Sequence, residues 1–258
     1  SRNPQIKLSQ SFGKFKLALT LLSQVDFMSD GPDGLNTKYL RNSAIPESNL
    51  IVQFATKNET KGTEFLLGAG INYQILTPRL STTVILKPAY DVVDSSGIVT
   101  HHVAETASYS TTATTSALAY NLYSKLKLKK ITFKLGAEYG ENNNAYTMLG
   151  GYTEKSVTDK NRNAVDYANI KSCAAWVEFH TNATRWQPGL FLGYGKNLGA
   201  GVTVKPYDLK PTVYYVRGGN IDYSYRISPR LVFNANKFRI AGEVEYTVAA
   251  YGKTNEKG

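Results

Sequence analysis

The chain has 258 residues, of which 42% are hydrophobic, and its 30 Lys and Arg against 20 Asp and Glu give a formal net charge of +10. A single cysteine excludes an internal disulfide and a zinc site built from cysteines. No window holds about 18 uninterrupted apolar residues, so a transmembrane helix is not expected. The positive charge suits nucleic acid, acidic lipid or anionic solutes, but no basic run has the texture of a nucleic-acid arm, and no nucleic acid is expected as a partner.

Alternation of apolar and polar residues with a period of two recurs along the chain and predicts β-strands. The segments are longer than the usual strand of about 5–6 residues and match the roughly 9–11 residues of a tilted strand that crosses a bilayer. About ten strands are expected, at residues 4–12, 15–27, 48–57, 63–76, 106–125, 129–142, 164–181, 186–197, 218–234 and 237–252.

Short and long connections alternate between these strands. The long ones lie near 28–47, 78–105, 142–163 and 198–217. Outer-membrane barrels have this rhythm of short turns at one end and long loops at the other. Pro78 and Pro88 do not suit a central strand, so 78–105 is interpreted as a long external excursion, with a hairpin of its own as one possibility. A bulge is expected near residues 169–172.

A soluble β-sandwich is the main alternative, because its strands also alternate. The long strands and the unequal loops argue against it. So do tyrosines near strand ends, which are typical of the aromatic girdles of membrane barrels. The fold class we predict is therefore all-β, a transmembrane antiparallel up-and-down β-barrel, with residues 1–258 as a single domain.

Alternation also divides the side chains between two faces. The residues predicted to face lipid are Phe15, Leu17, Leu19, Phe65, Leu67, Phe133, Leu135, Tyr223, Tyr225, Val244 and Tyr246. The predicted pore-lining residues are nearly balanced in charge: Lys7, Lys16, Lys57, Lys125, Lys134, Arg226, Arg230 and Arg239 against Asp26, Glu64, Glu138, Glu178, Asp222, Glu243 and Glu245.

Two interpretations of these charges stay open. Positive and negative walls could set up a transverse field that favours polar solutes, or the charges could pair across neighbouring strands and brace the wall. If a loop folds inward, 78–105 is the candidate, and Arg79, Lys87, His101 and His102 would then narrow the path.

The remaining motifs do not support a metal site, a hydrolase site or a reactive cysteine. His101 and His102 are adjacent and would point to opposite faces of a strand, so no metal site is expected. A hydrolase would need His180 beside a serine such as Ser172 or Ser224, and no spacing supports either pair. Cys173 falls on the apolar face, where a structural thiol is expected. The chain is not expected to be an enzyme or to bind a cofactor.

The stretches RNPQIKLSQ, RNSAIPESNLIVQF, EFLLGAGINYQILTPRL, GLFLGYGKNLG and NIDYSYRISPRLVFNANKFRIAGEVEYTVAAYG resemble porin-like outer-membrane proteins of the DcaP-like type. The resemblance covers most of the chain and rests on strand texture and spacing. It implies a trimeric barrel of about 16 strands that passes small, often anionic solutes. The chain lacks the signal peptide and the terminal aromatic strand of such proteins, so it is interpreted as incomplete at both ends, with about 14 to 18 strands in the full barrel.

The function predicted is that of an outer-membrane porin of Gram-negative bacteria, a channel for passive diffusion of small polar solutes. Its expected partners are outer-membrane lipid, lipopolysaccharide, small polar solutes and two further copies in a homotrimer. A non-conducting barrel that serves as a scaffold or as a surface-interaction component of an envelope complex is the alternative.

Overall fold

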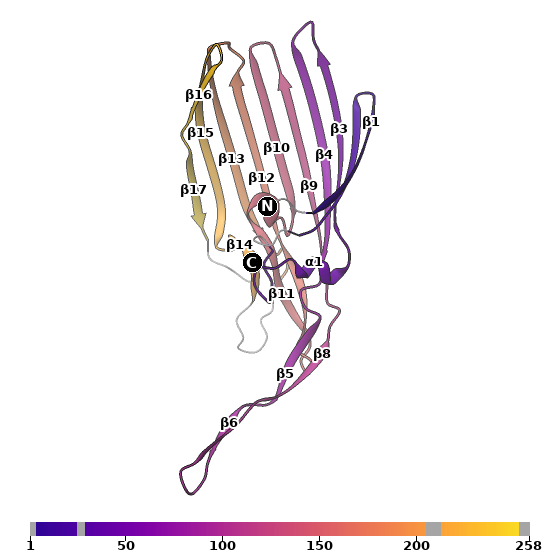
Figure 1. Ribbon diagram of the computed structural model, residues 1–258, viewed down its shortest axis with the longest axis vertical. Coiled ribbons are helices and arrows are strands. Elements are labelled where there is room, and N and C mark those ends of the chain that lie inside the picture. Colours follow the sequence, from indigo (N-terminus) through magenta and orange to yellow (C-terminus); the bar gives the residue numbers. More distant parts are fainter. Residues whose placement is uncertain (1–3, 25–28, 205–212, 253–258) are drawn as a thin grey trace.

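The computed structural model describes residues 4–24, 29–204 and 213–252. Its main element is a 13-stranded antiparallel sheet in which the central path runs β1-β2-β3-β4-β9-β10-β12-β13-β15-β16 (Figure 1). The strands of this path are β1 (Gln5–Phe12), β2 (Phe15–Leu22), β3 (Glu47–Asn58), β4 (Thr63–Leu76), β9 (Thr115–Lys127), β10 (Ile131–Glu141), β12 (Ala164–Thr181), β13 (Trp186–Gly199), β15 (Ile221–Ala235) and β16 (Phe238–Glu243).

Each strand of the path pairs with its neighbours in the chain once the long excursions are set aside, as an up-and-down sheet requires. The short turns lie together at one end of the sheet and the excursions at the other (Figure 1). Gly13, Gly62 and Asn236 take positive φ values of 59°, 62° and 54° in three of these turns, where tight reversal requires the left-handed region. The alternation of short and long connections is therefore confirmed.

Two predicted strands are divided in the structure. The strand expected at 106–125 is wrong in its first part: Glu105–Ser110 form β8, which pairs with β5 (Ser81–Lys87) outside the main sheet. The β4–β9 register ends at the pair Leu76–Thr115, because the chain leaves β4 through Thr77 and Pro78 and offers earlier residues no partner.

The strand expected at 237–252 appears as β16 and β17 (Tyr246–Tyr251), both paired with β15. The register is continuous across the gap, since Arg230 pairs with Glu243 and Ile227 with Tyr246. The interruption lies opposite Pro229, which has no N–H to donate, although its carbonyl still accepts from Val244 N at 3.1 Å. The bulge expected near 169–172 is confirmed by a register shift between Lys171 and Ser172.

The excursions carry the remaining elements. The first holds α1 (Lys38–Ser43), and the third holds α2 (Asn144–Thr147) and β11 (Gly150–Asp159). The fourth contributes β14 (Tyr214–Arg217), which pairs with β11. The second, predicted to contain a hairpin, pairs β5 with β8 and β6 (Tyr90–Val93) with β7 (Val99–His102), and it projects away from the sheet (Figure 1).

The main buried apolar cluster lies among the excursions and not against a face of the sheet. It joins Tyr39 and Leu40 of α1 to Leu76, Tyr152 and Tyr215. Burial raises the pKa of the Tyr152 phenol well above its ordinary value, so this ring stays neutral. Beside the cluster, Arg79 Nη2 lies 2.6 Å from Glu154 Oε1 and 2.8 Å from Tyr215 Oη. These contacts fasten the excursions to the end of the sheet.

The described strands make an open sheet: the predicted all-β class and antiparallel order are confirmed, and closure into a barrel stays a prediction. Within the described part of the chain, β1 pairs only with β2, and β16 and β17 pair only with β15. Side chains along β1 and β16 are exposed on both faces. The sheet therefore has two edges whose backbone groups are free to pair.

Candidate functional site

The two faces of the sheet differ in composition, as cross-strand rows of paired residues show. One such row runs from Phe15 through Phe54, Leu67, Ser124, Leu135, Val177, Leu192 and Ile227 to Tyr246. The row beside it on the opposite face runs through Lys16, Gln53, Gly68, Tyr123, Gly136, Trp176, Gly193, Arg226 and Thr247. We call these the apolar face and the polar face.

Burial is reversed relative to an ordinary soluble sheet. Side chains of the apolar face are exposed, for example Phe15 at 54%, Leu135 at 45% and Tyr246 at 57%. On the polar face, small and polar residues such as Thr20, Asn72 and Ser172 are buried. The polar face is therefore the covered side, and it is the candidate functional site.

Glycine makes room for larger side chains on the polar face. A Cβ at Gly136 would lie 2.5 Å from Nε1 of Trp176, its partner on β12. A Cβ at Gly68 would overlap the ring of Tyr123, its partner on β9. The glycines let these rings lie flat across the neighbouring strand.

An ion cluster occupies the polar face near the short turns. The Glu178 carboxylate lies 3.2 Å from Lys134 Nζ, and it also accepts from the Arg230 guanidinium. His180 Nδ1 lies 3.0 Å from Arg230 Nη2. Lys134, His180 and Arg230 border a cavity of about 500 Å³, whose other polar lining residues are Gln187, Arg239 and Glu243.

Other predicted inward charges also pair across strands. Glu64 accepts from Lys125 at 3.0 Å and from Lys127 at 3.2 Å, and Arg226 lies 2.9 Å from Glu245. Within the described residues, Arg239 and Glu243 form no ion pair although they border the same cavity. The polar face thus holds mostly paired charges with a small unpaired remainder at the cavity.

A second polar cluster lies at the excursion end, under α2. Glu47 Oε1 accepts from Asn72 Nδ2 at 2.7 Å and from the Tyr146 hydroxyl at 3.3 Å. Asn72 also donates to Tyr146 at 3.1 Å, and Asn142 Nδ2 donates to Gln74 Oε1 at 2.8 Å. Burial raises the pKa of the Tyr146 phenol, which keeps it a donor. The excursion that folds over the polar face is thus the one containing α2, whereas 78–105 projects outward.

The register of the strands assigns the residues predicted to face lipid or to line a pore to one of the two faces. The residues predicted to face lipid lie on the apolar face by register, except Val244, which lies between β16 and β17 and has no strand partner among the described pairings. Those predicted to line the pore lie on the polar face by register, except Asp222, Asp26 and Glu245. Glu245 lies between β16 and β17 and bonds Arg226 and Thr247, which belong to the polar face. Asp222 sits where the β15–β17 register shifts, and it binds Lys196 Nζ at 3.1 Å. Lys196 belongs to the row of Cys173 and Tyr223 on the apolar face. Asp26 lies outside the described residues.

The histidines and serine considered above as metal or hydrolase residues have the following contacts. His101 bonds Asp91 at 2.6 Å on one face of the β6–β7 hairpin, and His102 stacks on Tyr90 on the other. Ser172 bonds Thr147 and the carbonyl of Leu149, and it lies eight residues from His180 along β12. In the described part of the chain, no group of three or more His, Cys, Asp or Glu side chains could hold a metal ion.

Sequence reasoning missed the cluster under α2. Glu47 and Tyr146 are far apart in the chain, and neither belongs to a motif. The only signal was the run of three asparagines, Asn142 to Asn144, directly after a strand, which indicates a turn but not its direction.

Comparisons with known proteins add no relative. No protein-family model, no curated protein and no solved structure matches the chain. Among the described residues, no helix has the length and apolar character needed to cross a membrane.

Proposed function

We propose that this chain forms the wall of an outer-membrane β-barrel porin through which small polar solutes diffuse passively. The observation that carries the proposal is the inverted burial of the sheet, with an exposed apolar face and a covered polar face. Exposed apolar surface on this scale requires an apolar environment or a large partner. Lipid meets this need for a sheet with long tilted strands, because each strand alternates apolar-out and polar-in.

Aromatic residues on the apolar face form two belts. One lies near the short turns and contains Phe15, Phe54, Phe65, Phe133 and Phe179, with Phe15 and Phe54 ring centroids 5.1 Å apart. The other lies nearer the excursions and contains Tyr120, Tyr139 and Tyr223, with Tyr194 and Tyr225 one row nearer the middle of the face. Phe133 and Tyr139 are six residues apart on β10, which corresponds to about 20 Å. Because strands of membrane barrels tilt by about 40°, this separation covers about 15 Å of the apolar band of about 25 Å between their girdles.

A bilayer also sets a condition on the edges of the sheet. Lipid offers no hydrogen bonds, so the free backbone groups of β1, β16 and β17 must pair with further strands or with each other in the membrane. The proposal therefore includes closure of the sheet into a barrel. It also includes a homotrimer in the bacterial outer membrane, with lipid and lipopolysaccharide against the apolar face.

The proposed mechanism is size exclusion with weak electrostatic guidance. The excursion containing α2 narrows the space over the polar face near Asn72, and the cavity beside Arg230, Arg239 and Glu243 lies at the other end. Most charges between them are paired, which favours polar solutes without a strong preference for one sign.

Conductance in planar bilayers tests the proposal. Single-channel steps are expected from the full-length protein, and reversal potentials in a salt gradient are expected to shift toward cations when Arg226 and Arg239 are replaced by Glu. Folded protein that never conducts would contradict the channel. Unchanged reversal potentials would reject the placement of both arginines beside the solute path.

A non-conducting scaffold is the second candidate, and a specific observation favours it. Four bases of the polar face form ion pairs with carboxylates on neighbouring strands or turns: Lys134, Arg230, Lys125 and Arg226. Tyr146 also bonds Glu47 and Asn72. These contacts brace the wall. The same bilayer recordings separate the two candidates, because a scaffold gives an intact folded protein without conductance.

A further inference from the structure

The hairpin of residues 81–110, which we call the arm, carries apolar side chains that nothing in the described structure covers. Ile85, Val93 and Ile98 are each 63% exposed, and Val103 is 88% exposed. The arm projects from the excursion end of the sheet as a two-stranded ribbon (Figure 1). Such a ribbon is marginally stable in water by itself, so its apolar side chains need a partner.

The charge of the arm indicates what kind of partner it fits. Residues 81–110 contain Asp91, Asp94 and Glu105 against one base, Lys87, which pairs with Glu105, whereas the whole chain has a formal net charge of +10. An acidic segment is repelled by anionic lipid headgroups and attracted to a basic protein surface. Another copy of this chain offers such a surface.

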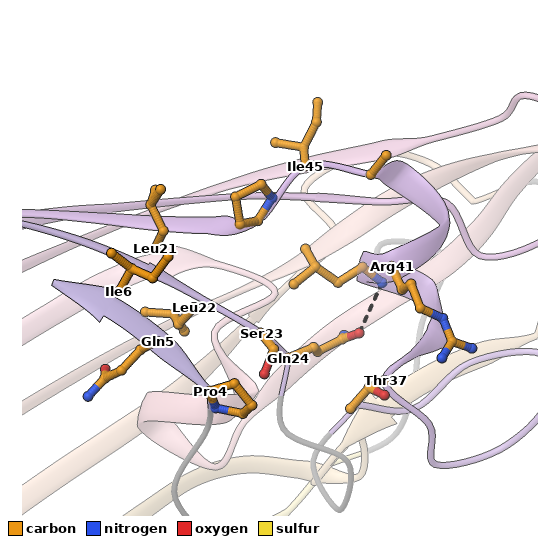
Figure 2. Close-up of a pocket in the computed structure, with 13 residues that line it drawn as sticks. Pro4, Gln5, Ile6, Leu21, Leu22, Ser23, Gln24, Thr37, Arg41 and Ile45 are labelled. Atoms are coloured by element: carbon orange, nitrogen blue, oxygen red, sulfur yellow. Dashed lines mark hydrogen bonds between the residues drawn. The ribbon is translucent and has the colours of Figure 1, made fainter.

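An apolar groove lies near the opposite edge of the sheet from β17. It has a volume of about 630 Å³ and is bordered by Ile6, Leu21, Leu22, Leu40 and Ile45, with the exposed Arg41 at its rim (Figure 2). Gln24 Oε1 accepts from Leu40 N at 3.1 Å and holds α1 beside the end of β2 (Figure 2). The groove is open, since Ile6 is 68% exposed and Ile45 43% exposed.

The root of the arm and the groove lie at the same end of the sheet. Thr77 N donates to Tyr39 O at 2.9 Å, and Asn42 Nδ2 donates to Thr77 O at 3.2 Å, so α1 is fastened to the residue from which the arm departs. The arm leads away from α1 and from the sheet (Figure 1). The strand path from Ser81 to Val93 spans about 40 Å when extended, which is enough to reach a neighbouring barrel.

We propose that the arm of one copy docks in the groove between β2 and α1 of the next copy. Apolar side chains of the arm fill the groove, and its carboxylates lie toward Arg41 at the rim. The contact joins two different surfaces, so repetition around an axis closes a ring. The inference rests on the homotrimer included in the proposed function and does not depend on conduction.

Mixed cross-linking of the full-length protein tests this contact. In a Cys173→Ser background, one tagged chain carries Val93→Cys and a differently tagged chain carries Ile45→Cys. After the two are refolded together in detergent and oxidised, disulfide-linked pairs that contain both tags are expected. The matched control replaces Ile45→Cys with Leu128→Cys, an exposed apolar position at the short-turn end, and no linked pair is expected.

Charge exchange gives a second measurement that does not depend on cysteine chemistry. Asp91→Arg or Arg41→Glu alone is expected to shift light-scattering masses toward the monomer, and the double variant is expected to restore the assembly. Cross-linking equal to that of the Leu128 control, or assembly unchanged by both single variants, would overturn the proposal. Protection of Ile45→Cys from a thiol reagent by lipopolysaccharide on isolated monomers would assign the groove to lipid and overturn it as well.

Bilayer recordings on the same samples separate the two proposals. Conductance without the arm-to-groove link refutes the docking contact and leaves the porin intact. A linked assembly that never conducts supports the docking contact and refutes the porin.

Discussion

The apolar and polar faces of the sheet obey the same alternation and differ in what surrounds them. On β12, Ala175 lies on the apolar face and is exposed, whereas its neighbour Ala174 lies on the polar face among Glu138 and Gly195. In a soluble sheet the apolar face would be the buried one. The comparison teaches that the hydrophobic pattern tells which residues share a face, whereas the exposure of each face tells whether that face packs inside the protein or contacts its surroundings.

The largest expected effect comes from placing a charge on each face in turn. Ala175→Arg puts a guanidinium near the middle of the apolar face, and a lipid-facing Arg at the bilayer midplane costs about 2–4 kcal/mol. Ala174→Arg introduces the same group one residue away, beside Glu138, and is expected to be tolerated. Urea unfolding in lipid vesicles measures the difference. Equal destabilisation by both variants would break the distinction between the faces.

Removal of the central carboxylate of the ion cluster is expected to have the next largest effect. Glu178→Ala leaves Lys134 and Arg230 without their shared acceptor, which costs about 1–3 kcal/mol. Glu178→Gln keeps the shape and hydrogen bonding and serves as the control for lost charge. Both variants are expected to shift the reversal potential toward anions, and only the alanine is expected to lower the unfolding midpoint strongly.

Substitution of a glycine on the polar face tests the close approach of aromatic rings. Gly136→Ala forces a Cβ against Trp176 and is expected to cost about 1–3 kcal/mol by overpacking. Gly242→Ala is the matched control, because nothing lies within 4 Å of the added Cβ at this position. A double variant with Trp176→Ala is expected to recover part of the loss, as a double-mutant cycle would show.

The smallest effect is expected at the contact between α2 and the sheet. Tyr146→Phe removes the hydroxyl that bonds Glu47 and Asn72, at a cost of about 1 kcal/mol. If the excursion narrows a pore, open-channel noise or conductance is expected to rise in bilayer recordings. An unchanged current with a lowered stability would assign Tyr146 to bracing alone.

Sequence reasoning predicted the strands and faces because both depend on neighbours along the chain. Phe133 and Leu135 on one side and Lys134 and Glu138 on the other are separated by alternation alone. Alternation alone does not assign Asp222 to a face, because the register shift beside Tyr223 depends on pairing with β17. Sequence reasoning predicted a single strand at 106–125 because strand character is local, while the choice between β5 and β4 as a partner is not.

The sequence by itself determined the period-two pattern, the strand lengths and the alternation of short and long connections, since each follows from the order of residues in the chain. Only the tertiary structure decided which excursion covers the polar face, which charges pair and where the sheet is open. These features join residues such as Glu47 and Tyr146 that are nearly a hundred positions apart. Their contact depends on loop closure and packing across several strands, for which no local pattern exists.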